Sequence, residues 1–272
     1  MVTPSTQFIK YPLGAKEAAL LTQLSGQNQR VFTLKDAVSI LNDRPENVKM
    51  LLSRLTRKKW LKRLERGKYL IVPLEAGPER EFTEYELLIA SRLITPYYIG
   101  YKTALNFYGY TEQISPIVYV VSTRRKTAIT INQVCYQFVT LKKEKFFGSK
   151  KTWVAGTEVN LSNPEKTIID CLDQPRYGGG IGEVAKALRY GENEIDLKKV
   201  VTYGKRMNNR AILQRLGFLL EFLKLADERL LSEIQSSIGR GFVKLDPIGK
   251  SFGSYYSKWR VRVNISLSSL GE

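Results

Sequence analysis

The feature that most constrains this chain is a basic stretch from Arg44 to Lys68, in which a helical pattern runs into a hairpin pattern. Only two acids, Glu46 and Glu65, lie within it. Its cations are Arg44, Lys49, Arg54, Arg57, Lys58, Lys59, Lys62, Arg63, Arg66 and Lys68. Such a cluster is the electrostatic footprint of a surface that binds phosphates.

Three helical patterns lead into the hairpin. Strong helix formers fill residues 15–24, and Thr33 is placed to cap a second helix over Leu34–Leu41, whose apolar residues recur at helical spacing. Pro45 suits the first turn of a third helix. Two strand-like runs follow around Gly67, which is free to take the positive φ that a tight turn needs. Helices followed by a basic helix and a hairpin predict a winged helix-turn-helix domain.

The third helix has the properties of a recognition helix. Its apolar stripe of Val48, Leu51, Leu52 and Leu55 leaves polar and basic side chains on the outward side, where they suit base edges and phosphates. The alternative is a solvated charged helix face beside an ordinary hairpin. The residues expected to contact DNA, on this helix and on the wing, are Arg44, Asn47, Lys49, Met50, Ser53, Arg54, Arg57, Lys58, Arg63, Arg66 and Lys68.

The composition of the whole chain supports a nucleic-acid partner. The formal net charge is +17 and the isoelectric point is about 9.8, and such an excess speeds encounter with polyanions. No apolar run approaches the roughly 20 residues that a membrane span needs. The N-terminus also lacks the pattern of a secretory signal. We therefore expect a cytoplasmic protein that has no membrane partner.

The composition excludes several common kinds of active site. The chain has no histidine, which excludes the usual Ser-His-Asp and Cys-His nucleophiles. Cys135 and Cys171 lie in apolar stretches, so we expect buried, unreactive thiols and no structural zinc site. Asp170 and Asp173 lie in a predicted helix, where Asp170 is expected to pair with Lys166 at i, i+4 rather than to hold a metal. The sequence predicts no enzyme, no cofactor and no metal.

A second domain is expected after a linker that ends at Gly77-Pro78. Residues 1–78 then form the DNA-binding domain, and residues 79–272 form a mixed α/β domain, so the chain is α+β. Strands are expected at residues 117–121, 127–131, 134–141, 152–159, 242–245 and 259–265. Helices are expected at residues 82–94, 164–172, 181–190, 197–205, 209–224 and 227–238. The glycine run of residues 178–182 is expected to be a turn between helices rather than an anion site.

A second basic set lies between residues 197 and 220, where the sequence has no acid. Its members could form another surface for polyanions, either flanking DNA or an RNA. Arg215 is equally compatible with a structural role as an ion-pair partner inside the helix bundle. The set consists of Lys198, Lys199, Lys205, Arg206, Arg210 and Arg215.

Three passages of the second domain resemble the C-terminal domain of AbiEi-type antitoxins, which belong to abortive-infection, type IV toxin-antitoxin systems. The resemblance covers nearly the whole chain, because that family also begins with a winged helix that ends in a hairpin such as Arg66-Gly67-Lys68-Tyr69. It does not account for residues 251–256. The passages are Leu161-Ser-Asn-Pro-Glu-Lys-Thr-Ile-Ile-Asp-Cys-Leu-Asp173, then Pro175 with Gly178-Gly-Gly-Ile-Gly-Glu-Val-Ala-Lys-Ala-Leu188, and Arg215-Leu-Gly-Phe-Leu-Leu220.

The resemblance implies a function for each domain. The N-terminal domain would repress its own promoter by binding double-stranded DNA with inverted repeats. Residues 79–272 would be the antitoxin domain, which counteracts a nucleotidyltransferase-like toxin encoded beside it without forming a stable complex. The alternative is a winged-helix transcription factor with a ligand-sensing second domain and no toxin. A nucleic-acid-processing enzyme would need a constellation of carboxylates that the sequence does not offer.

Overall fold

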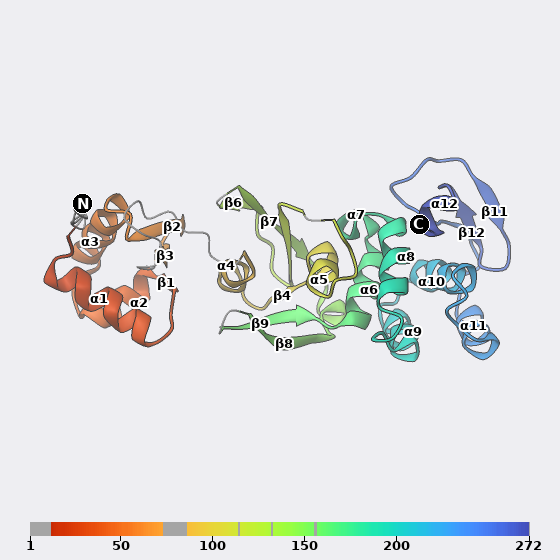
Figure 1. Ribbon diagram of the computed structural model, residues 1–272, viewed down its shortest axis with the longest axis horizontal. Helices are drawn as coiled ribbons and strands as arrows, with labels where there is room; N and C mark the ends of the chain where they lie inside the picture. Colours follow the sequence, from red (N-terminus) through yellow and green to blue (C-terminus); the bar gives the residue numbers. More distant parts are fainter. Residues whose placement is uncertain (1–11, 73–85, 114, 132, 155–156, 272) are drawn as a thin grey trace, which may run out of the picture. The chain divides into compact units, whose positions relative to one another are not determined.

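The structure is a computed structural model that describes residues 12–72, 86–113, 115–131, 133–154 and 157–271. Contacts divide the chain into two compact units, Met1–Glu84 and Tyr85–Glu272. The boundary expected after residue 78 lies outside the described residues. Each unit combines helices with a sheet (Figure 1), and the α+β fold class is confirmed.

The first unit is a winged helix-turn-helix fold, with three helices and a three-stranded sheet in the order β1-β3-β2. Thr33 begins the second helix through a reciprocal cap: its hydroxyl accepts from the Asp36 N–H, and the Asp36 carboxylate accepts from the Thr33 N–H at 2.6 Å. The elements are α1 (Ala15–Gly26), β1 (Val31–Thr33), α2 (Leu34–Leu41), α3 (Pro45–Arg57), β2 (Leu61–Glu65) and β3 (Lys68–Ile71).

The expected hairpin forms from β2 and β3, and Gly67 in its turn has a φ of +76°. The strand β1 was not predicted from the sequence. It pairs antiparallel with β3, and Val31 lies opposite Leu70. With three residues, β1 is too short to show a period-two pattern, and its partner strand lies far along the chain. The wing is therefore joined through β3 to β1, which precedes α2.

The second unit contains a mixed six-stranded sheet in the order β6-β7-β5-β4-β9-β8. The predicted single strand over residues 152–159 is wrong, because this region forms the antiparallel pair β8 and β9. The strands are β4 (Tyr98–Ile99), β5 (Ile117–Ser122), β6 (Ile129–Ile131), β7 (Val134–Thr140), β8 (Ser149–Val154) and β9 (Thr157–Ser162).

Helices α4 and α5 lie before and between the first strands of the sheet in the chain, and the others follow β9 (Figure 1). Of the helix predicted over residues 82–94, the described part is helical from Glu86 to Leu93. The helices are α4 (Glu86–Leu93), α5 (Tyr101–Phe107), α6 (Pro164–Asp173), α7 (Pro175–Gly178), α8 (Ile181–Tyr190), α9 (Leu197–Arg206), α10 (Arg210–Phe222), α11 (Glu228–Gln235) and α12 (Ser268–Gly271).

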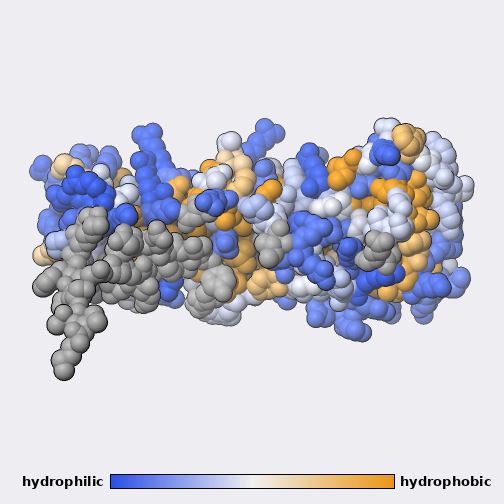
Figure 2. Space-filling model, turned by 45° about the horizontal axis from the view of Figure 1, so that its top comes forward, coloured by the Kyte–Doolittle hydropathy of each residue, from blue (hydrophilic) through white to orange (hydrophobic). Residues whose placement is uncertain are grey.

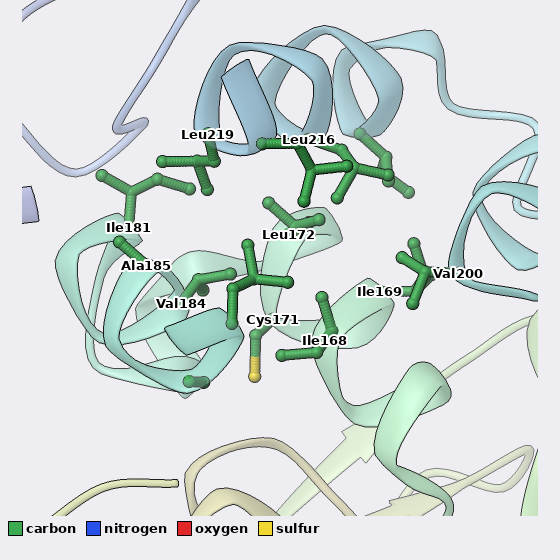
Figure 3. Close-up of a cluster of buried hydrophobic side chains, with 14 of the residues drawn as sticks. Ile168, Ile169, Cys171, Leu172, Ile181, Val184, Ala185, Val200, Leu216 and Leu219 are labelled. Atoms are coloured by element: carbon green, nitrogen blue, oxygen red, sulfur yellow. The ribbon is translucent and has the colours of Figure 1, made fainter. Parts of the chain in front are cut away.

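Helix α6 forms the centre of the second unit. Side chains from α8, α9 and α10 surround it in the core that Figure 3 shows, where Ile168, Ile169 and Leu172 meet Val184 and Leu216. Every residue of α6 from 165 to 172 is buried. A helix that is buried all round must hold its polar side chains in internal contacts, because water cannot reach them.

The pair formed by Lys166 and Asp170 is the clearest case. The i, i+4 pair expected from the sequence forms, and both side chains are completely buried. The Lys166 ammonium contacts the Asp170 carboxylate and lies 4.9 Å from the ring centre of Phe147. The Tyr98 hydroxyl donates to Asp170 at 2.8 Å. Burial raises the pKa of the Asp170 carboxyl, and the Lys166 charge opposes that rise.

A separate three-stranded sheet follows α11, in the order β10-β12-β11, and α12 comes after it. It is formed by β10 (Val243–Lys244), β11 (Ser254–Tyr256) and β12 (Val261–Val263). Trp259, which is fully buried, packs against α10 at Gly217, where an added Cβ would lie 2.2 Å from the indole ring. Only glycine leaves room for this contact, and it anchors the small sheet to the helices.

Candidate nucleic-acid interface

The outward face of α3 carries the side chains that the sequence suggested for DNA. Val48, Leu51, Leu52 and Leu55 are buried, as the predicted stripe requires. The opposite face is exposed and consists of Asn47, Lys49, Met50, Ser53, Arg54 and Arg57. The structure thus gathers one long polar and basic face on a single rigid helix, next to the wing.

Two of the expected cations are partly neutralised by Glu17 from α1. The Glu17 carboxylate lies 2.7 Å from the Lys58 ammonium and 3.8 Å from the Arg54 guanidinium. Burial works to raise the pKa of Glu17, but hydrogen bonds from Lys58 and from the Gly14 N–H outweigh it and leave the pKa lowered. The pairing of Glu17 with Lys58 could not be predicted from the sequence, because no local pattern connects residues that lie 41 positions apart.

Other cations of the interface have no acid beside them within the described part of the chain. They are Arg44, Lys49, Arg57 and Arg66. Lys68, in contrast, pairs with Glu65 at 2.9 Å, and the Arg63 guanidinium reaches the Glu65 carbonyl oxygen at 3.4 Å. An unpaired exposed cation can meet a phosphate without first breaking an ion pair, so these four are the best placed for that contact.

Asn47 is held at the start of α3. Its amide donates to the Asp43 carboxylate at 2.8 Å, which also accepts from the Arg44 N–H and from Lys16. The hydrogen bonds from Lys16, Asn47 and Arg44 lower the pKa of Asp43 to about 2. The side chain of Asn47 is therefore oriented by Asp43, whereas that of Ser53 is exposed and has no such anchor among the described residues.

The second basic set does not form one continuous surface. Arg215 is buried inside the helix bundle, as one alternative expected, but it donates to the carbonyl oxygens of Leu172 and Lys244 rather than to an acid. Lys199 pairs with Glu165, and Lys205 pairs with Glu233 at 2.7 Å. The remaining members, Lys198, Arg206 and Arg210, are exposed, and Arg206 lies 3.9 Å from the ring centre of Phe147.

Asp170 and Asp173, the two acids considered as metal ligands, both have internal partners. Asp170 binds Lys166 and Tyr98, and Asp173 accepts from Lys145 and from Asn209 at 2.7 Å. No group of three potential ligands that could hold a metal ion occurs among the described residues. Among the helices that the structure describes, none has the length and apolar character that crossing a membrane requires.

The glycine run before α8 is a turn, as expected. Gly179 and Gly180 both have positive φ values, and α7 ends there. The place where an anion would meet the start of α8 is taken by the Asp246 carboxylate, which accepts from the Ile181 N–H at 3.4 Å. An internal acid therefore satisfies this helix terminus.

The cysteines differ from each other. Cys171 is buried in the core that surrounds α6 (Figure 3), and burial raises the pKa of its thiol well above the usual value. Cys135 is partly exposed on β7, so the expectation of a buried thiol is correct for Cys171 alone.

Comparison with known proteins agrees with this architecture. A family model described as a transcriptional regulator, AbiEi antitoxin, matches residues 20–72, and a model of the AbiEi antitoxin C-terminal domain matches residues 98–222. The search of curated proteins gave no match. The crystal structure of the RV2827C protein from Mycobacterium tuberculosis is similar with a TM-score of 0.65 and 11% identity, over 93% of this chain and 92% of that chain. At this identity the likeness shows a common fold. With a regulator domain at its N-terminus and an antitoxin domain after it, the chain belongs to the AbiEi family of antitoxins.

Proposed function

We propose that this chain is the antitoxin of a type IV toxin-antitoxin system, that it represses its own promoter, and that it counteracts a nucleotidyltransferase-like toxin encoded beside it. The observation that carries the promoter role is the exposed face of α3, where Lys49, Met50 and Ser53 project from a helix whose other face is buried. The family matches support the antitoxin role. The proposed operator is double-stranded DNA with inverted repeats, and no stable complex with the toxin is needed.

Each part of the interface has a proposed task. The uncharged side chains of α3 reach base edges, and the cations of α3 and of the wing hold phosphates. Asn47, Met50 and Ser53 are proposed for base contacts. Arg44, Lys49, Arg54, Arg57, Lys58, Arg63, Arg66 and Lys68 are proposed for phosphates. The wing tip at Arg66 also suits the minor groove, because a single cation there extends beyond the strands.

Ser53→Ala is expected to reduce the preference for operator over random DNA by roughly 1–3 kcal/mol, the usual size of one specific base contact. Arg66→Ala is expected to weaken binding to both DNAs together, since a phosphate contact carries no sequence information. Fluorescence anisotropy with operator and shuffled duplexes measures both effects. If Ser53→Ala lowers both affinities equally, α3 does not read bases through this residue.

Charge reversal at Lys205, Arg206 and Arg210 is expected to reduce protection from the toxin while leaving promoter repression intact. The three residues are exposed, so their substitution changes the free energy of unfolding little. Cells that express the adjacent toxin with each variant, together with a promoter reporter, report both functions at once. Lys49→Glu with Arg57→Glu in the full chain is the reciprocal control, expected to lose repression and keep protection. Loss of both functions in either variant would contradict the proposed division between the two units.

One observation favours the second candidate, a regulator whose second unit senses a ligand. A cavity of about 480 Å³ lies beside α5, lined by Lys102, Asn106, Phe107 and Gln113 among others. Cavities of this size accept small molecules. The gene beside this one distinguishes the candidates: a nucleotidyltransferase-like reading frame supports the antitoxin, and the lack of one supports the ligand-sensing regulator.

A further inference from the structure

The small sheet at the end of the chain presents one face outward, and that face combines aromatic and basic side chains. Register places Tyr255 of β11 opposite Arg262 of β12, and Arg262 opposite Lys244 of β10. Register partners project to the same side of a sheet, and Phe242 lies on that side because it precedes Lys244 by two residues. We call Phe242, Lys244, Tyr255 and Arg262 the sheet platform. It lies outside the ranges that the family models match.

Burial distinguishes the two faces of this sheet. Val261 is fully buried, and Val243 and Val263 pack against the main core, so these residues form the inner face. On the outer face, Tyr255 is 63% exposed and Phe242 is 48% exposed. Their rings meet edge to face with centres 5.0 Å apart. Hydrophobic residues reach the surface at the end of the unit that carries β11 and β12, as Figure 2 shows.

The segment that carries the platform is mostly positive, although Glu221 of α10 lies beside β11 and pairs with Lys258. Residues 239–271 contain one acid, Asp246, which is buried and accepts from the Ile181 and Ile248 N–H groups. The same segment contains Arg240, Lys244, Lys250, Lys258, Arg260 and Arg262. Lys250 lies 5.5 Å from the ring centre of Phe252, which is 72% exposed on the β10–β11 connection. Among the described residues, no carboxylate pairs with Arg262.

We propose that the sheet platform binds single-stranded nucleic acid. Bases stack on the exposed rings of Tyr255 and Phe242, and Phe252 extends the stack. Adjacent strands lie about 4.8 Å apart, so Arg262 and Lys244 stand one and two strands away from Tyr255, where they can hold the phosphates of the same nucleotides. In a duplex the base faces are covered by their neighbours, so a stacking surface selects single strands.

The arrangement of the charges favours this ligand over a protein partner. Tyr255 and Tyr256 also line a mostly apolar groove of about 390 Å³, together with Phe222, Leu267 and the carboxylate-bearing Glu221. A partner protein bound only in this groove would contact apolar side chains, and the cations that lie in register with Tyr255 would have no role in its binding. A second copy of the chain would bring an equally basic face, which is repelled. Exposed rings and cations lie together on one face. A sugar-phosphate chain with unstacked bases is complementary to both.

Binding to the full chain is measured with fluorescent single-stranded RNA and DNA of about 12 nucleotides. Tyr255→Ala is expected to weaken binding roughly 5- to 150-fold, the range that the stacking of one base supplies. Tyr255→Phe is expected to retain binding. The matched control is Tyr190→Ala, because Tyr190 is 53% exposed in the same unit but lies at the end of α8. Tighter binding of RNA would assign the ligand to RNA, tighter binding of DNA would assign it to DNA, and equal binding would support a surface for single strands of either kind.

The winged helix is itself proposed to bind DNA, so the position of the bound oligonucleotide is measured directly. Oligonucleotides that carry a photoreactive base are expected to crosslink to peptides within residues 242–262 of the full chain. Duplex DNA binding is expected to be unchanged in Tyr255→Ala. The proposal is overturned if Tyr255→Ala and Arg262→Ser bind both oligonucleotides like the parent chain, or if crosslinks occur only in residues 12–72. It is also overturned if these variants lose binding to vesicles that contain phosphatidylserine and keep binding to the oligonucleotides.

Discussion

Lys166→Met is expected to lower the free energy of unfolding by about 3–5 kcal/mol, because it leaves the Asp170 carboxylate buried without its cation. Asp170 would retain the hydrogen bond from Tyr98, but one neutral donor does not replace a charge in a site closed to water. Urea unfolding of the second unit, followed by circular dichroism, measures the loss. The protein as a whole is expected to unfold in two transitions, since it has two compact units.

The double variant Lys166→Met with Asp170→Leu tests the cause. Replacing both partners removes the buried charge, so much of the lost stability is expected to return. The matched control is Lys151→Met, which removes the exposed pair with Glu158, whose atoms lie 2.7 Å apart. Surface pairs contribute about 0–1 kcal/mol. If the double variant is as unstable as Lys166→Met, the loss comes from packing rather than from the unpaired carboxylate.

This pair also shows what the sequence could predict about the second unit. The i, i+4 spacing of Lys166 and Asp170 was visible, and the contact between them is confirmed. Its burial was not predictable, because the charged residues of α6 suggested a helix with one solvated face. Only the packing of α8, α9 and α10 around α6 closes that face. Local patterns describe neighbours on one helix but not the elements that later cover them.

The same limit explains which elements were predicted well. The bounds of α2, α3 and α8 follow from a capping threonine, an initial proline and apolar residues at helical spacing, all of which are local. The strand β1 depends on β3, with which it pairs from a distant position. The β8–β9 hairpin was merged into one strand because the sequence there favours β structure on both sides of Ala155-Gly156.

The sequence predicted which side chains of α3 are exposed, but it did not predict which of them form ion pairs with other parts of the first unit. The exposed face of α3 could be derived, because burying Val48 and Leu52 forces Lys49 and Ser53 outward. The ion pairs of Arg54 and Lys58 with Glu17 could not, since they depend on how α1 packs against α3. Arg215 illustrates the same difficulty. Its sequence context left open whether it lies on a basic surface or inside the bundle, and its contact with the Leu172 carbonyl oxygen is internal.

Raising the salt concentration from about 50 to about 200 mM is expected to weaken binding of the full chain to its promoter duplex about 1,000-fold. With about six phosphate contacts, the slope of log K against log salt is expected to be roughly −5. The unpaired cations Arg44, Lys49, Arg57 and Arg66 are the first candidates for these contacts, because they neutralise phosphates without breaking an internal pair.

Arg57→Ala and Arg66→Ala are each expected to make the slope less steep by about 0.9, the contribution of one released counterion. Arg54→Ala is expected to change it less, since Glu17 already lies 3.8 Å from that guanidinium. Lys151→Ala, on the other unit, serves as the control and is expected to leave the slope unchanged. A salt-independent affinity would remove the electrostatic basis of the interface. If Arg54→Ala and Arg57→Ala change the slope equally, Glu17 must separate from Arg54 when DNA binds. The ion pair would then be a contact of the free protein that DNA replaces.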